Sequence, residues 1–250
     1  MKSNNSGKTI LITGGTRGIG KSAALYLAKE SVSTFFINYL ENDEAAMAIQ
    51  TELESMGARV FLLKNNMAFT EEIMAMFKVI KEQTGQLDFF VHCPAVTAFK
   101  PLCKVKPNQW DLTMNVNARS FLQCTQGCIP LMQNGGQIVA VSSTGSRRYT
   151  PNYGALGVTK STLEAVVRYL AVELAERNIR VNGVTAGLIK GKSVPPFPDL
   201  ESIMEETLKR TPAGRLGTPD DVAEVIHFLL TRATWMYGQN ILIDGGYCLT

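Results

Sequence analysis

The hydrophobic positions along the chain alternate between short continuous runs and longer stretches with helical spacing. Short apolar runs such as KTILIT and QIVAVSS predict buried strands, and the longer amphipathic stretches predict helices. The predicted strands cover residues 8–13, 33–39, 59–64, 87–93, 135–143, 178–184 and 240–245. The predicted helices cover residues 20–31, 43–57, 70–85, the region around Trp110, 117–132, 153–177 and 219–230.

This alternation predicts one α/β domain over residues 1–250. Continuous apolar strands joined by helical crossovers form parallel sheets that helices cover on both faces. We therefore expect a Rossmann-like, doubly wound sheet of about seven strands. A chain of 250 residues is long enough for one such domain, and no repeat or linker divides it.

One long irregular segment, residues 190–199, follows the sixth predicted strand. It contains three prolines within four residues, Pro195, Pro196 and Pro198. Because ligands of open α/β sheets bind at the carboxyl ends of the strands, we expect a substrate loop or lid over residues 188–210. The alternative is a surface excursion without a function.

Composition and charge argue against several classes of protein. The net charge of +3 is too small to favour nucleic acid. No apolar run is long enough to span a bilayer, and the polar start MKSNNSGK is not typical of a signal peptide. Five cysteines without metal-site spacing indicate reduced thiols in a cytoplasmic protein. With two histidines and no HExxH motif, we expect no metal site.

A glycine-rich loop, TGGTRGIG, connects the first predicted strand with the first predicted helix. Its glycines, Gly14, Gly18 and Gly20, allow a tight turn and let a phosphate approach the free N–H groups of the helix start. No Gly-Lys-Ser/Thr ends the loop, so it is not a Walker loop. The loop predicts a dinucleotide site, and a purely structural turn is the alternative.

The end of the second predicted strand bears on which dinucleotide binds. An acidic residue there would bind the ribose diol of NAD, whereas this chain has Asn38 and Tyr39, with Glu41 slightly later. Arg17 lies in the glycine loop, where a guanidinium can bind a 2′-phosphate. The sequence therefore favours NADPH. NADH is not excluded, because Glu41 would oppose that phosphate and Arg17 has the alternative of a solvated loop cation.

A tyrosine and a lysine near the start of the longest predicted helix are candidates for acid–base chemistry. Tyr153 and Lys160 are almost two helical turns apart and share a face, with α-carbons roughly 10 Å apart along the axis. A nearby ammonium favours the phenolate, so we expect Lys160 to lower the pKa of Tyr153 and make it a better proton donor. Ser142 and Ser143 end a strand at the same sheet edge.

Over its whole length the chain resembles the short-chain dehydrogenases/reductases. The matching motifs are TGGTRGIG, Trp110 with Asn117, VSS, Tyr153 with Lys160, IRVNGVTAG and ILIDGG. Most members of that family place three residues between the tyrosine and the lysine. Here six residues intervene, which is similar to bacterial enoyl-acyl-carrier-protein reductases and, with TPAGR, closest to their third, NADPH-using type.

That resemblance implies an activity and an assembly. The activity is NADPH-dependent reduction of the 2,3-double bond of an enoyl thioester, carried by an acyl carrier protein or coenzyme A, in fatty-acid or polyketide-type biosynthesis. The implied assembly is a homotetramer. The alternatives are a 3-oxoacyl thioester ketoreductase or another specialised biosynthetic reductase, and, in a different class, a non-catalytic dinucleotide-binding module.

The resemblance also assigns site residues. It implies that Tyr153 is the catalytic tyrosine, that Lys160 holds the nicotinamide ribose, that Ser143 assists orientation and that Asn117 supports Lys160 through water. The implied cofactor contacts are Gly14, Thr16, Arg17, Gly18, Ile19, Gly20, Asn38, Asn66, Met67, His92, Ala95, Lys160, Gly187 and Ile189.

Three stretches depart from the family pattern. HCPA, residues 92–95, replaces a stretch close to Asn-Asn-Ala-Gly, Asn66 stands where an aspartate is common, and no threonine follows Gly187. These departures would weaken dinucleotide binding or mark a specialised substrate.

Five basic residues are candidates for a basic ring at the mouth of the site, which could dock an acidic carrier. Solvated surface charge is the alternative reading of these residues. They are Arg119, Arg147, Arg148, Lys190 and Lys192.

Overall fold

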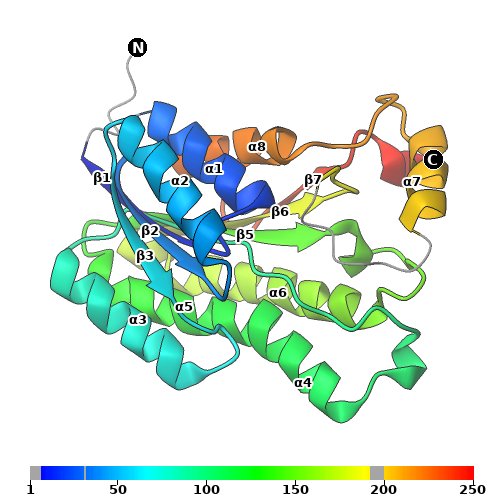
Figure 1. Cartoon of the computed structure of the whole chain (residues 1–250), viewed down its shortest axis with the longest axis horizontal. Helices are drawn as coiled ribbons and strands as arrows, with labels where there is room; N and C mark the ends of the chain where they lie inside the picture. The colour runs from blue at the N-terminus through cyan, green and yellow to red at the C-terminus, as the bar shows by residue number, and fades with distance from the viewer. Residues whose placement is uncertain (1–6, 31, 192–199) are drawn as a thin grey trace.

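A computed structural model of the protein describes residues 7–30, 32–191 and 200–250. Its centre is a seven-stranded sheet in which every neighbouring pair is parallel, in the order β3-β2-β1-β4-β5-β6-β7 (Figure 1). The strands are β1 (Lys8–Thr13), β2 (Val32–Tyr39), β3 (Arg59–Lys64), β4 (Phe89–His92), β5 (Gly136–Ser143), β6 (Ile179–Ala186) and β7 (Asn240–Ile243). The predicted doubly wound α/β class is confirmed.

Helices cover both faces of this sheet, because successive side chains of a strand point to opposite sides. In β1, Ile10 and Ile12 pack in the cluster that contains residues of α1, α2 and α8, whereas Leu11 packs in the cluster of α3, α5 and α6. Figure 1 shows these two groups of helices above and below the sheet. The helices are α1 (Gly18–Lys29), α2 (Asp43–Ser55), α3 (Thr70–Gln83), α4 (Pro107–Met114), α5 (Ser120–Cys128), α6 (Gly154–Glu173), α7 (Leu200–Arg210) and α8 (Pro219–Thr231).

The strand order reverses beside β1. The chain moves outward from β1 to β2 and β3, and then returns to β4 on the other side of β1. Thr13 and His92 are partners in the β1–β4 register at the carboxyl ends of these strands. Such a reversal opens a crevice between the connections that leave the sheet, and ligands of open α/β sheets bind there.

The helix α7 is an element that the sequence pattern does not predict. Among its described residues only Thr207 is buried, and Leu208 is 43% exposed. Its apolar residues nonetheless have helical spacing, at Leu200, Ile203, Met204 and Leu208, and the proline-containing stretch before them leads to the expectation of a loop. The expected loop or lid over residues 188–210 is therefore helical in its second half. Its three prolines and the rest of 192–199 lie outside the described residues.

Candidate active site

The glycine loop has the shape that a dinucleotide phosphate requires. Gly14 and Gly18 adopt positive φ angles of 66° and 54°, and a Cβ on Gly20 would lie 2.3 Å from the carbonyl oxygen of Gly14. The helix α1 has no acidic residue in its first turn, and Arg17 gives it no side-chain cap. Its N–H groups are thus left for an anion, so the loop fits the pyrophosphate of a dinucleotide.

Two other residues predicted to contact the cofactor, Thr16 and Ile19, pack within the protein, whereas Arg17 is exposed. Thr16 is buried, and Ile19 packs against the core beneath the loop. Arg17 is exposed, so its guanidinium is accessible to a 2′-phosphate. The role of Arg17 in choosing the dinucleotide stays a prediction.

The predicted side-chain contacts at the ends of β2 and β3 are engaged within the protein. Asn38 is buried and donates to the carbonyl oxygens of Leu63 at 3.1 Å and Asn65 at 3.0 Å. Its amide therefore joins these two strands and is not directed to a ribose. Asn66 Oδ1 accepts from the N–H of Ala68 at 2.9 Å, which forms the entry to α3.

Met67, the next residue, is also buried, and it packs in the core cluster of α3, α5 and α6. At Asn38 and Met67 the side chains are therefore enclosed. Contacts to a dinucleotide from these two positions would have to come from the backbone.

His92 is a core residue. It is fully buried, with Nδ1 2.9 Å from Thr13 Oγ1 and Nε2 3.4 Å from Ser120 Oγ. Burial and the charge of Lys160 hold the pKa of His92 well below its usual range, so the imidazole is neutral. The predicted side-chain contact of His92 with a cofactor is therefore not supported, because the ring lies beneath the sheet edge.

The loop after β4 packs against the glycine loop. A Cβ on Gly14 would lie 3.2 Å from the backbone nitrogen of Pro94, so these two loops are in contact. Cys93 N–H donates to the carbonyl oxygen of Thr13 at 3.0 Å, and Ala95 is exposed. The proline in the HCPA stretch is thus accommodated where no N–H is needed for the sheet.

Tyr153 and Ser143 form a hydrogen-bonded pair at the carboxyl end of β5. The hydroxyl of Tyr153 donates to Ser143 Oγ at 3.0 Å, and Gly145 N–H donates to the same oxygen at 3.2 Å. Tyr153 is the residue before the first turn of α6, and Asn152 precedes it in the left-handed region at φ 60°. Burial raises the pKa of Tyr153, and the hydrogen bond with Ser143 only partly opposes this.

Lys160 joins three elements of the site. Its Nζ donates to the carbonyl oxygens of Val141 at 2.7 Å and Pro94 at 3.3 Å. Burial lowers the pKa of Lys160 to about 8. The expected lowering of the pKa of Tyr153 by Lys160 is wrong for this arrangement, because burial dominates at the phenol.

Asn117 lies in a π-helical segment, Asn115–Arg119, that interrupts the helix between α4 and α5. Its Oδ1 accepts from the N–H of Val96 at 2.9 Å, and its Nδ2 donates to the carbonyl oxygen of Val96 at 2.8 Å. The sequence predicts a link from Asn117 to Lys160 through water. In the structure the amide fixes the loop whose Pro94 carbonyl accepts from Lys160, and the link through water stays a prediction.

The last predicted cofactor contacts follow β6. Gly187 N–H donates to the carbonyl oxygen of Ile243 at 2.8 Å, and a Cβ on Gly187 would lie 2.9 Å from Asp244. Ile189 forms an isolated bridge with Gly217. The sheet therefore brings these positions to the same edge as Ser143, although Gly187 packs against Asp244 after β7 and Ile189 pairs with Gly217 before α8.

Three of the five basic side chains predicted for the ring have partners within the protein. Arg119 donates to the carbonyl oxygen of Ala68. Arg147 contacts Glu164, and the guanidinium of Arg148 lies 5.1 Å from the centre of the Tyr247 ring. These three side chains are engaged within the protein. Lys190 is exposed, and Lys192 lies outside the described residues.

Metal-binding groups and membrane-spanning helices are both absent from the described residues. In the part of the chain that the structure describes, no group of three or more His, Cys, Asp or Glu side chains could hold a metal ion. No helix within the described ranges combines the length and apolarity that crossing a bilayer requires.

Comparison with known proteins shows the family to which this chain belongs. A family model described as Enoyl-(Acyl carrier protein) reductase matches residues 14–248. The chain belongs to the short-chain dehydrogenase/reductase family. It is an oxidoreductase, which sets aside the alternative of a non-catalytic binding module.

Several relatives of this short-chain reductase align over nearly all of it. A 1-cyclohexenylcarbonyl-CoA reductase from Streptomyces collinus is 40% identical over 239 residues, covering 94% of this chain and 85% of the relative. The 3-oxoacyl-acyl-carrier-protein reductase FabG of Staphylococcus aureus is 32% identical, covering 96% and 97%. A solved Bacillus cereus enoyl-acyl carrier protein reductase with NADP+ and indole naphthyridinone has a TM-score of 0.90 at 29% identity, covering 98% of both chains.

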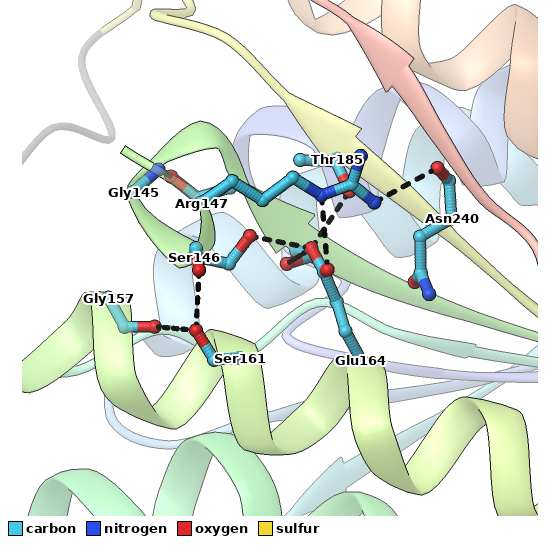
Figure 2. Close-up of polar contacts among 10 residues, drawn as sticks. Gly145, Ser146, Arg147, Gly157, Ser161, Glu164, Thr185 and Asn240 are labelled. Atoms are coloured by element: carbon cyan, nitrogen blue, oxygen red, sulfur yellow. Dashed lines mark hydrogen bonds and ion pairs between the residues drawn. The ribbon is translucent and has the colours of Figure 1, made fainter. Parts of the chain in front are cut away.

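One polar residue of this short-chain reductase is absent from the predicted site, namely Glu164. It is buried on α6, and its carboxylate accepts a hydrogen bond from Ser142. It also accepts from Ser146 and Thr185 and contacts Arg147 (Figure 2). Burial alone would raise the pKa of Glu164, but these hydrogen bonds outweigh it and lower the pKa. The sequence signal was an acidic residue beside the apolar face of the long helix.

Proposed function

We propose that this protein is an NADPH-dependent enoyl thioester reductase. The observation that carries the proposal is the Tyr153–Ser143 hydrogen bond at the start of α6, with Lys160 two turns further along. The name of the Streptomyces collinus relative describes a carbon–carbon double bond conjugated to a thioester carbonyl. That is the substrate class which a displaced tyrosine suits.

The geometric reason is the distance between the two ends of the reacting group. When bound, the reduced nicotinamide supplies a hydride. In an enoyl thioester the carbon that accepts it is three bonds from the oxygen that gains negative charge. In a ketone the two atoms are one bond apart. A donor for the thioester oxygen must therefore lie further from the nicotinamide, and a tyrosine one turn earlier on the helix meets that need.

The side chains then have separate tasks. Because its pKa is raised, the phenol of Tyr153 is protonated at neutral pH and can donate to the thioester oxygen. Ser143 fixes the direction of that hydroxyl. Lys160 donates a hydrogen bond to Pro94 in the loop after β4, and it would contact the nicotinamide ribose. The proton for Cα comes from Tyr153 or from solvent.

The dinucleotide would be held by the glycine loop. Gly14, Gly18 and Gly20 leave room for the pyrophosphate at the start of α1, and the exposed Arg17 would pair with a 2′-phosphate. The strand β2 ends in Asn38 and Tyr39, so no carboxylate stands at its end to bind the ribose diol of NAD. These features support NADPH over NADH.

A substrate panel tests this proposal. Purified protein is assayed with crotonyl and acetoacetyl thioesters of coenzyme A and acyl carrier protein, each with NADPH and NADH. We expect crotonyl thioesters with NADPH to have the highest kcat/KM, and Tyr153→Phe to abolish this turnover. Faster turnover of the acetoacetyl thioesters by the wild type would contradict the proposal.

Reduction of 3-oxoacyl thioesters is the second candidate. Ser143 within hydrogen-bonding distance of Tyr153 is an arrangement that also suits a ketone oxygen, and the FabG relative aligns over 96% of this chain. The same panel distinguishes the two, because a ketoreductase would consume acetoacetyl thioesters and leave crotonyl thioesters unchanged.

The carrier and the assembly remain predictions. Either coenzyme A or an acyl carrier protein would present the same thioester to Tyr153. The two pairs of thioesters in the panel compare these carriers directly, and light scattering of the purified protein measures the predicted homotetramer.

A further inference from the structure

The carboxylate of Glu164 joins three parts of the chain directly behind the Tyr153–Ser143 pair. Oε1 accepts from Ser146 at 2.6 Å, from Ser142 at 2.7 Å and from Thr185 at 3.0 Å. Oε2 lies 3.3 Å from Arg147 Nε. Figure 2 shows Glu164 rising from α6 toward the turn that carries Ser146 and Arg147.

Fold stability gives little reason for a carboxylate at this position. Removing a charge from water costs several kcal/mol, and well-packed apolar residues are often as stable as a buried ion pair. The neighbouring Leu163 and Val167 are fully buried apolar residues of the same helix. An acid that must be satisfied by four separate side chains is therefore better explained by the geometry that it imposes on them.

The turn after β5 is the segment that this geometry fixes. A Cβ on Gly145 would lie 2.5 Å from the ring of Tyr153, and a Cβ on Gly157 would lie 2.5 Å from the carbonyl oxygen of Gly145. The turn is thus wedged between the tyrosine ring and α6. Gly145 N–H also donates to Ser143 Oγ, so a movement of the turn changes both members of the pair.

We propose that Glu164 is a positioning residue. By holding Ser142 on one side of Ser143 and Ser146 on the other, it keeps Ser143 Oγ within hydrogen-bonding distance of the Tyr153 hydroxyl. The inference rests on the proposed function in that Tyr153 and Ser143 are taken to act on the substrate. Its geometric part can be measured without turnover.

The variant Glu164→Gln tests this role at constant side-chain size. An amide keeps one acceptor oxygen but presents N–H groups to donors and loses the charge that faces Arg147. We expect kcat for the thioester to fall by about 10- to 100-fold, since small misplacements of catalytic groups have effects of this size. The KM for the thioester and the Kd for NADPH should change by less than about threefold, because Glu164 is buried and its carboxylate is held by protein side chains.

Asp88 provides a matched control. It is also a buried carboxylate, and it accepts from Lys8 at 2.6 Å, from the N–H of Thr9 at 2.9 Å and from Gln86 at 2.9 Å. It lies at the amino ends of the strands, away from the candidate site. Asp88→Asn should therefore destabilise the fold without changing kcat. Ser146→Ala, which removes one bond to Glu164, should lower kcat in the same direction as Glu164→Gln and carries the test if that variant does not fold.

Amide hydrogen exchange supplies the readout that is independent of activity. Glu164→Gln and Ser146→Ala should speed exchange of the Gly145 N–H by at least about tenfold, whereas Asp88→Asn should leave it unchanged. Unchanged Gly145 exchange, or an equal fall of kcat in Asp88→Asn, would overturn the positioning role. If the wild type turns over no thioester but exchange responds as expected, the proposed function fails and the positioning of the turn stands.

Discussion

The hydroxyl of Tyr153 lies 3.0 Å from Ser143 Oγ and donates a hydrogen bond to it. The two residues come from different elements, since Ser143 ends β5 and Tyr153 precedes α6. Because burial raises the pKa of Tyr153, the phenol keeps its proton at neutral pH and can donate a hydrogen bond. A substrate oxygen that accepts from this hydroxyl would take the place of Ser143 Oγ, and the O–H of Ser143, which is not used in the bond with Tyr153, would donate to the same oxygen.

Removal of the phenol hydroxyl should therefore remove turnover and leave the fold intact. We expect Tyr153→Phe to lower kcat/KM by about 10²- to 10⁴-fold, the usual contribution of a positioned proton donor. Thermal unfolding and NADPH titration should match the wild type, because the ring still packs against Gly145. Ser143→Ala should have a smaller effect. A Tyr153→Phe enzyme with wild-type kcat would remove Tyr153 from the reaction.

Lys160 predicts a pH dependence of stability. Its folded-state pKa of about 8 lies below the ordinary value of 10.5, so between these pH values the unfolded chain binds more protons than the folded one. Stability should rise with pH across this window. The full cost of the buried charge is present below about pH 8 and is absent above about pH 10.5.

Urea unfolding of the wild type and of Lys160→Met at several pH values measures this contribution. The difference between their unfolding free energies should change by up to about 1.4 kcal/mol per pH unit within the window, which is the limit for one proton. Using the difference removes the titration of the tyrosines and cysteines that both proteins share. A difference that does not vary with pH would show that Lys160 titrates as in the unfolded chain.

Gly20→Ala should disrupt dinucleotide binding. Its Cβ would lie 2.3 Å from the carbonyl oxygen of Gly14, so the loop must shift from the shape that leaves room for a phosphate. We expect the Kd for NADPH to rise at least about tenfold and stability to fall by about 1–3 kcal/mol. Gly85→Ala is the control, because nothing lies within 4 Å of a Cβ there. Equal NADPH affinities in the two variants would contradict the assignment.

Arg17 should decide between the two dinucleotides. Arg17→Ala should raise the KM for NADPH by about tenfold or more, which corresponds to the loss of a hydrogen bond with a charged partner. The KM for NADH should stay unchanged, since NADH has no 2′-phosphate. Arg17→Lys should keep part of the preference, because the charge remains but the bidentate geometry is lost. Parallel losses for both dinucleotides would indicate a role in loop structure alone.

The local pattern of the chain predicts most of the fold. Continuous apolar runs specify strands buried on both faces, and the glycines at 14, 18 and 20 specify a loop whose close approach only glycine permits. The helix α7 is missed although its apolar residues have helical spacing, because the three prolines just before it favour an irregular loop. The sequence likewise predicts Tyr153, Ser143 and Lys160 as neighbours, since parallel strands and their crossovers bring these positions to one edge.

Side-chain partners depend on the tertiary structure. The sequence expects cofactor contacts from His92, Asn38 and Met67, but each of these side chains is buried once the sheet has formed. Sequence spacing shows which residues share an edge and does not show which way an end-of-strand side chain turns. Asn117 and Lys160 both bond to the loop after β4. These bonds form only when that loop packs against the π-helical segment that carries Asn117 and against α6, which carries Lys160.

By itself, the sequence determined the strand–helix alternation, the glycine loop and the tyrosine–lysine spacing, because these follow from local backbone preference and from the periodicity of apolar residues. Only the tertiary structure decided that burial raises the pKa of Tyr153, that Lys160 binds two carbonyl oxygens, and that Glu164 gathers three hydroxyls and Arg147. Solvent exclusion and hydrogen-bond partners come from segments far apart in the chain, and so they exist only after the helices have packed on the sheet.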